Sequence, residues 1–232
     1  MKEVFLPRAP SFQELSKRNQ QMKKLFTAIQ KNDHTTVAAL LDKSPELIRC
    51  VHQGNPKRFD GQSPLQVALK TADTQMVELL LTYSPDVNFM ETEPCANDWR
   101  APVLHDAINR AIMETRWNVR RPDGLEVFNT QAQADEAFAI LKKLIELGAD
   151  VNAQDSYGNA AMDRACLQAR QILPRPNSDD RLLTDELRND LSRIFALLKQ
   201  SGADMSYTAP NAFGRTYAEQ YSGESVSVFI TA

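Results

Sequence analysis

The stretch Gly148-Ala149-Asp150-Val151-Asn152-Ala153 decides the fold, because parts of it occur three times in the chain. The other copies read Asp86-Val87-Asn88 and Gly202-Ala203-Asp204-Met205. Each copy follows an apolar run that is typical of a helix, and these runs cover residues 76–81, 140–145 and 194–198. A helix and turn that recur in this way indicate a stacked array of similar units rather than one globular core.

The opening of the clearest unit reads Gly61-Gln62-Ser63-Pro64-Leu65-Gln66-Val67-Ala68. Asp60-Gly61 is typical of a turn. Ser63 is a good helix N-cap, and Pro64 suits the first helical position, where its missing N–H donor costs nothing. The sequence therefore predicts a helix that begins at Pro64.

This opening resembles that of an ankyrin repeat, Gly-x-Thr-Pro-Leu-His-x-Ala, with Ser63 in place of Thr and Gln66 in place of His. The apolar run 77–81 and Asp86-Val87-Asn88 match the second half of such a repeat. The resemblance implies an all-α fold, an ankyrin-repeat solenoid of stacked helix-turn-helix units with extended finger loops. It also implies that the fingers and the first helix of each unit line a concave binding face.

The copies lie further apart than the ankyrin period of about 33 residues, which predicts insertions between the two helices of two units. We expect these insertions at about 115–134 and 171–189, with one extra residue after Pro102. Pro7 and Pro10 limit helix formation near the N-terminus. The predicted organisation is an extended lead-in over 1–21 and an ankyrin-repeat domain over 22–232, with units at about 22–58, 59–91, 100–154, 155–208 and 211–232.

Stacking should align equivalent side chains of successive units in rows, because no unit can bury its apolar face alone. We expect an inner row of large residues, an outer row, and small residues where helices approach closely. These are, in that order, Leu65, Leu104 and Met162; Leu80, Leu144 and Leu197; and Ala68, Ala107 and Ala165.

Composition narrows the class of partner. The net charge of −3 argues against nucleic acid, which usually needs a basic face. No apolar stretch is long enough to cross a membrane, and the first residues carry no apolar signal core. Three widely spaced cysteines show no disulfide framework. We expect a monomeric protein located in the cytoplasm, or in a host cytosol if it is a secreted effector, that binds neither membrane nor nucleic acid.

The sequence contains few of the residue patterns that enzymes need. The chain shows no phosphate-binding glycine loop, no nucleophile elbow and no metal-ligand spacing, so we expect no cofactor, no metal and no enzymatic activity. His105 is the tempting catalytic residue, but the resemblance implies that it joins its helix start to the adjacent turn by hydrogen bonds. An enzyme would require a polar pocket around His105, Asp106, Arg110 and Asp163.

The finger after Asn88 is longer than the next one and is the first candidate for partner binding. It carries Phe89, Glu91, Glu93 and Trp99, an aromatic anchor within an acidic rim. The alternative is that Trp99 folds back to cover the neighbouring repeat.

The second candidate is the basic and aromatic run that contains Arg116, Trp117, Arg120 and Arg121. These residues suit an acidic partner or stacking on single-stranded nucleic acid. The alternative is a solvated loop whose Trp117 packs on the lengthened helices. The ordinary repeat geometry places both insertions at the edge opposite the fingers.

The sequence thus favours a non-enzymatic module that presents a preformed concave face to a protein partner. One role is a bacterial effector that acts on a host protein. The alternative is an immunity or antitoxin protein that inhibits a toxin enzyme, and an enzyme with its site in the insertions is the third hypothesis.

Overall fold

The computed structural model describes residues 11–95, 98–175 and 178–231. Helices dominate these residues, and two short strands join them. In chain order the elements are α1 Phe12–Gln30, α2 His34–Lys43, the 3-10 turns η1 Pro45–Arg49 and η2 Lys57–Phe59, α3 Pro64–Thr71, α4 Thr74–Thr82, α5 Val103–Met113, β1 Asn118–Arg121, β2 Gly124–Val127, α6 Gln131–Glu146, α7 Ala161–Ala169, α8 Asp185–Gln200, η3 Pro210–Ala212, α9 Tyr217–Gln220 and α10 Ser227–Thr231.

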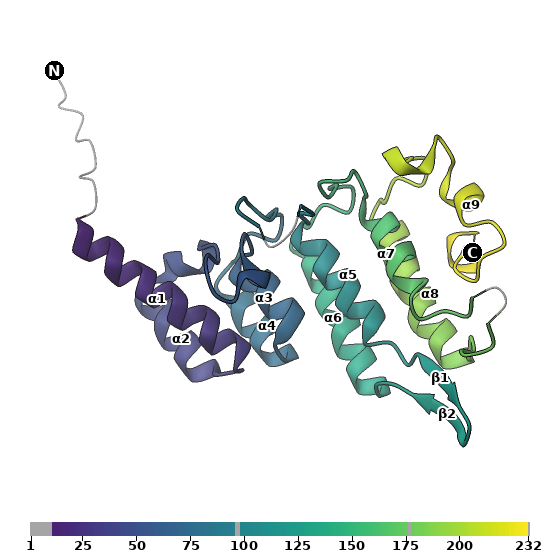
Figure 1. The fold of residues 1–232 in the computed structure, drawn as a ribbon, viewed down its shortest axis with the longest axis horizontal. Helices are drawn as coiled ribbons and strands as arrows, with labels where there is room; N and C mark the ends of the chain where they lie inside the picture. Colours follow the sequence, from purple (N-terminus) through teal and green to yellow (C-terminus); the bar gives the residue numbers. More distant parts are fainter. Residues whose placement is uncertain (1–10, 96–97, 176–177, 232) are drawn as a thin grey trace.

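The helices form antiparallel pairs that follow one another along the long axis of the molecule (Figure 1). The pairs are α1/α2, α3/α4, α5/α6 and α7/α8, and α1 and α9 lie at opposite ends of the row. Long loops rise at one edge, between one pair and the next, and the β1–β2 hairpin extends from the other edge. The mostly helical character expected from the sequence is confirmed.

The start of α3 shows how the sequence dictates the local structure. Ser63 Oγ accepts from Gln66 N at 3.2 Å and Gln66 Oε1 accepts from Ser63 N at 3.2 Å, which forms a capping box that satisfies two free backbone donors. Gln66 Nε2 also donates to Ala101 O at 3.0 Å and so ties α3 to the next unit. Helix α5 begins at Val103 with Pro102 as its N-cap, so the extra residue expected after Pro102 is Val103, which takes the first helical position that Pro64 takes in α3.

The repeated Asp-Val-Asn phrase links each unit to the next. Asn88 Nδ2 donates to Gly148 O at 2.9 Å, and Asn88 Oδ1 accepts from Asp150 N at 2.8 Å. Asn152 repeats both bonds one unit later, to Gly202 O at 3.0 Å and from Asp204 N at 2.8 Å. The phrase recurs because each copy supplies the polar groups that the preceding copy needs.

The side chains of the predicted core rows are largely buried, as expected. The inner row and the small residues are all buried, as are two members of the outer row. Leu197 is only partly buried, and Leu198 takes its place in the core because the α8 helix turns that residue inward.

The lead-in and the first insertion differ from expectation. Helix α1 begins at Phe12, so the predicted extended lead-in is wrong beyond Ser11, which caps the helix together with Glu14. Residues 1–10, with Pro7 and Pro10, lie outside the described part of the chain. The insertion at 115–134 holds the β1–β2 hairpin, which was not predicted.

Candidate protein-binding surfaces

Trp99 lies against the next unit instead of projecting from its finger. Its Nε1 donates to Asp155 Oδ2 at 2.7 Å, and the guanidinium carbon of Arg164 lies 4.6 Å from its ring centroid. Asp155 also accepts from the backbone and side chain of Asn159. Burial raises the pKa of the Asp155 carboxyl, but hydrogen bonds from Asn159 and Trp99 outweigh it and hold the pKa below its usual value. The structure favours the alternative in which Trp99 covers the neighbouring repeat.

Glu91 is buried beneath the same finger, with only 4% of its surface exposed. Its carboxylate accepts from Lys70 Nζ at 2.9 Å and from Ala101 N at 3.0 Å. Lys70 Nζ also lies 3.3 Å from Asp106 Oδ1, and the three side chains form a charged cluster between α3, the finger and α5. The carboxylate of Glu91 is therefore occupied by contacts within the fold and is not available to a partner. The prediction that Glu91 belongs to an exposed acidic rim is wrong.

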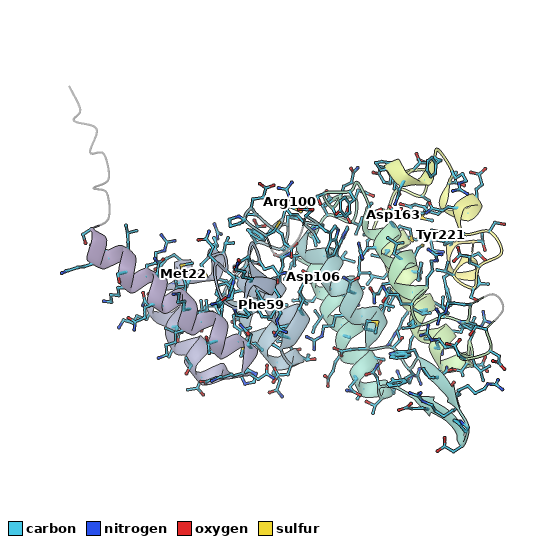
Figure 2. The ribbon with its side chains drawn as sticks, viewed as in Figure 1. Met22, Phe59, Arg100, Asp106, Asp163 and Tyr221 are labelled. Carbon is cyan, nitrogen blue, oxygen red and sulfur yellow. The ribbon has the colours of Figure 1, made fainter. Side chains whose placement is uncertain are left out.

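Asp106 is the unusual member of this charged cluster. Burial raises the pKa of its carboxyl to about 6, and Lys70 only partly offsets the effect. Neither carboxylate oxygen has a well-formed hydrogen bond among the described residues. The labelled side chain lies within the helical body, below the loop edge that Arg100 marks (Figure 2).

His105 is fully buried, and burial lowers the pKa of its imidazole to about 4. The ring is therefore neutral at pH 7. It lies near the Ala153 backbone, as the resemblance implies, but neither ring nitrogen forms the expected hydrogen bond within the described chain. In the preceding unit, Gln66 takes the equivalent position and does form a hydrogen bond to the next finger, from its Nε2 to Ala101 O.

The residues predicted to catalyse in an enzyme do not converge on an open pocket. His105 and Asp106 are buried, Asp163 accepts from Tyr217 Oη at 2.9 Å, and Arg110 donates to Ala72 O at 2.8 Å. His105 and Asp106 are thus enclosed by the fold, and Asp163 and Arg110 are each held by a structural contact.

The basic run at the first insertion divides into two parts. Arg116 forms a bidentate pair with the buried Asp190, with Nε and Nη2 contacts of 3.0 and 2.9 Å. Trp117 stacks on Phe128 with centroids 4.0 Å apart. Arg120 and Arg121 remain exposed on the hairpin. Trp117 Nε1 also donates to Met113 O in α5 at 3.1 Å, and its ring is partly buried against the core. The structure therefore favours the alternative in which Trp117 packs on the helices.

Two exposed aromatic side chains escaped the sequence-based prediction. Tyr157 is 57% exposed and Phe213 is 86% exposed. Each directly precedes a glycine in the finger that leads to the next first helix. Phe213 also has a left-handed backbone, with φ 54°, which is costly for a bulky residue. The shared aromatic-Gly pattern was the available signal.

These two fingers pack on each other, which brings their tips together. Gly158 has φ +80°, and an added Cβ would lie 2.7 Å from the Pro210 ring, so only glycine fits between the fingers. Tyr207 Oη donates to Gly158 O at 2.5 Å and fixes the same contact. The exposed rings of Tyr157 and Phe213 are therefore carried by one rigid pair of loops.

The other predicted finger residues stay at the edge. Phe89 is partly buried against the core, and Glu93 is exposed, 3.5 Å from Arg100. No cluster of potential metal ligands occurs among the described residues. Within the same residues, no helix is both long and apolar enough to span a bilayer.

Comparison with known proteins agrees with this architecture of paired helices and finger loops. Residues 60–91 match the ankyrin repeat family model, which confirms the resemblance noted above. The chain is also 26% identical over 162 residues to the ankyrin repeat protein FPV244 of Fowlpox virus (strain NVSL). The similar region covers 67% of this chain and 22% of the viral protein, so the chain spans about a fifth of that relative.

Proposed function

We propose that this chain is a non-enzymatic protein-binding module, built as an ankyrin-type solenoid whose finger edge meets the partner. The exposed Tyr157 and Phe213 on the last two fingers carry the proposal. Aromatic rings are frequent energetic anchors of protein interfaces. A ring that is exposed and also sits on a left-handed backbone costs folding free energy, so its presence is better explained by binding than by the fold.

The surroundings of these rings suit a partner with acidic groups at the rim of its contact. Arg215, two residues after Phe213, is exposed, and its Nε donates to Ala212 O at 3.2 Å. Arg100 is half-buried beside the Tyr157 finger, where its backbone N donates to Ser156 Oγ at 3.0 Å. Glu93, an exposed acid of the predicted rim, lies 3.5 Å from Arg100.

Within this class the effector hypothesis and the immunity or antitoxin hypothesis both fit a rigid finger edge. The first reading is an effector that acts on a host protein, and inhibition of a toxin enzyme is the alternative. Both are consistent with a monomer in the cytoplasm or in a host cytosol. The five units proposed from the sequence, within 22–232, would present the edge as one surface, and α1 extends the first of them to Phe12.

The test removes the rings while sparing the fold. Phe213→Asn suits the left-handed backbone, because asparagine tolerates positive φ, and Tyr157→Ser trims the second ring. Tagged wild-type protein should recover a stoichiometric partner, and the double variant should bind the purified partner at least about tenfold more weakly. Leu147→Ser is the matched control, because Leu147 is 46% exposed at the end of α6, in a groove that it shares with Leu81 and Ile140.

Two results would refute the proposal. One is the absence of any stoichiometric partner for the wild-type chain. The other is a partner that binds the double variant as tightly as the wild type while the control also binds normally. Thermal unfolding of all three proteins shows whether a lost interaction reflects a lost fold.

A further inference from the structure

The β1–β2 hairpin has one covered edge and one open edge. Arg120 N on β1 donates to Asp180 O at 2.7 Å. Asn118 exchanges two bonds of 2.8 Å with the backbone of Leu182. The second insertion thus closes the outer side of β1, and β2 is exposed along its whole length.

The register shows which backbone groups of β2 face outward. Arg121 pairs with Gly124 across the turn, Val119 pairs with Glu126, and Phe128 N donates to Trp117 O at 2.8 Å. Hydrogen-bonded and non-hydrogen-bonded pairs alternate in an antiparallel ladder. Gly124, Glu126 and Phe128 therefore bond inward to β1, and the N–H and C=O groups of Leu125 and Val127 point away from the hairpin.

The side chains of β2 form a simple pattern along this open edge. Leu125 and Val127 lie on one face and are 37% and 53% exposed. Glu126 lies on the other face, and its Oε2 accepts from Arg121 Nε at 2.7 Å. The carboxylate is half exposed, so it retains room for a second cation.

We propose that the open edge of β2 binds an extended segment of a partner protein as an added antiparallel strand. The bound segment carries a cationic residue between two apolar residues. Backbone groups of Leu125 and Val127 form the ladder, and the partner's apolar residues pack opposite these two side chains. The cation lies opposite Glu126. This site is separate from the finger edge and does not depend on the finger proposal.

A second copy of this chain fits the edge less well. The register that places Leu125 opposite Val127 of the other copy also places Glu126 opposite the same glutamate, and like charges in that position are destabilising. Shifting the register by one residue sets Leu125 against a glutamate. A strand of four residues also buries much less area than a stable dimer needs.

The experiment uses the full chain, labelled with nitrogen-15, and an acetylated and amidated peptide of sequence threonine-valine-lysine-valine-threonine. We expect saturable shifts of the Leu125 and Val127 amide signals, with a dissociation constant on the order of 1 mM for so short a ladder. A peptide with glutamate in place of lysine should bind about fivefold more weakly.

Variants at Val127 separate strand addition from general stickiness. Val127→Pro removes an outward N–H and leaves the inward bonds of the hairpin intact, so it should abolish the shifts at Leu125. Val127→Ile retains the N–H and the apolar face and should bind as the wild type does. An unchanged Arg120 amide signal in the free variants shows that the hairpin remains folded.

Several outcomes would overturn the proposal: no shifts at the two amides, equal binding of the lysine and glutamate peptides, or unchanged binding by Val127→Pro. Concentration-dependent shifts of the same amides without peptide would assign the edge to a second copy. Each outcome is independent of whether the finger variants bind their own partner.

Discussion

Two junctions of the array bury a carboxylate in different ways. Between α3 and α5, Asp106 is 2% exposed and faces Lys70, whose Nζ lies 3.3 Å from Oδ1. Between α5 and α7, Asp155 is 5% exposed and accepts hydrogen bonds from Trp99, Tyr157 and Asn159. The pKa of Asp106 is raised to about 6, whereas the pKa of Asp155 is lowered.

Both carboxylates have a cation nearby, since Arg164 Nη2 also lies 3.5 Å from Asp155 Oδ2, so the difference lies in the directed N–H donors around Asp155. A cation lowers the energy of the ionised form, but the lost solvation is restored only where N–H groups point at the oxygens. Asp155 has such donors from its own finger and from the preceding one. Asp106 lies in a cluster of side chains that were brought together by helix packing.

The largest expected effect is the loss of Asp155. Asp155→Ala leaves the Trp99 indole N–H, the Asn159 groups and Arg164 without their shared acceptor. Breaking a buried, hydrogen-bonded charge in this way should lower the free energy of unfolding by about 3–5 kcal/mol. Urea unfolding followed by tryptophan fluorescence measures the loss, because Trp99 itself reports on the junction.

Asp204→Ala is the matched control, since Asp204 accepts from Ser206 N at 2.9 Å in an exposed turn. It should cost about 1 kcal/mol or less. Equal losses for Asp155→Ala and Asp204→Ala would show that burial at the junction does not govern the energetics, and the comparison would fail.

The next effect concerns the pH dependence set by Asp106. Its pKa is raised from 3.8 to about 6 on folding, so its stabilising contribution is present below pH 4 and is lost as pH rises through 6. Asp106→Asn removes this titration. Relative to the variant, the wild-type free energy of unfolding should therefore fall by about 2–3 kcal/mol between pH 4 and pH 7.

Urea unfolding of both proteins at a series of pH values provides the measurement. Other carboxylates contribute equally to wild type and variant, and they cancel in the difference between the two curves. A difference that stays constant from pH 4 to pH 7 would show that Lys70 fully compensates Asp106. The two junctions would then be energetically alike.

Local chemistry explains what the sequence could predict. Ser63 and Pro64 determine the start of α3 by capping, and the alternation of large and small residues identifies the buried rows, so these elements were predicted correctly. The ankyrin resemblance predicts a further unit at 211–232, whose sequence matches the repeat pattern only weakly, and helices α9 and α10 occur there.

Contacts between distant segments explain what it could not predict. The sequence predicts Arg116 as a binding residue because its partner, Asp190, lies far along the chain on α8. The sequence predicts Glu91 in an acidic rim because nothing in its neighbourhood along the chain points to Lys70 as a partner. Lys70 lies on α3, and all of α4 separates it from the finger that carries Glu91. The exposed Phe213 could not be separated from a core aromatic, since exposure is a property of the folded finger and not of the residue type.

The smallest effect tests whether the two junctions differ only in their buried carboxylates. Asn88→Ala and Asn152→Ala each remove one pair of exposed hydrogen bonds, at the first and second links of the Asp-Val-Asn phrase. Water replaces these bonds in part, so each change should lower the free energy of unfolding in urea by about 1 kcal/mol, and the two losses should be equal.

Asn88→Asp retains the acceptor for Asp150 N and loses the donor to Gly148 O. The new carboxylate lies close to that of Asp150, so this variant should be no more stable than Asn88→Ala. Unequal costs for the two alanine variants would place the difference between the junctions in the whole interface rather than in Asp106 and Asp155.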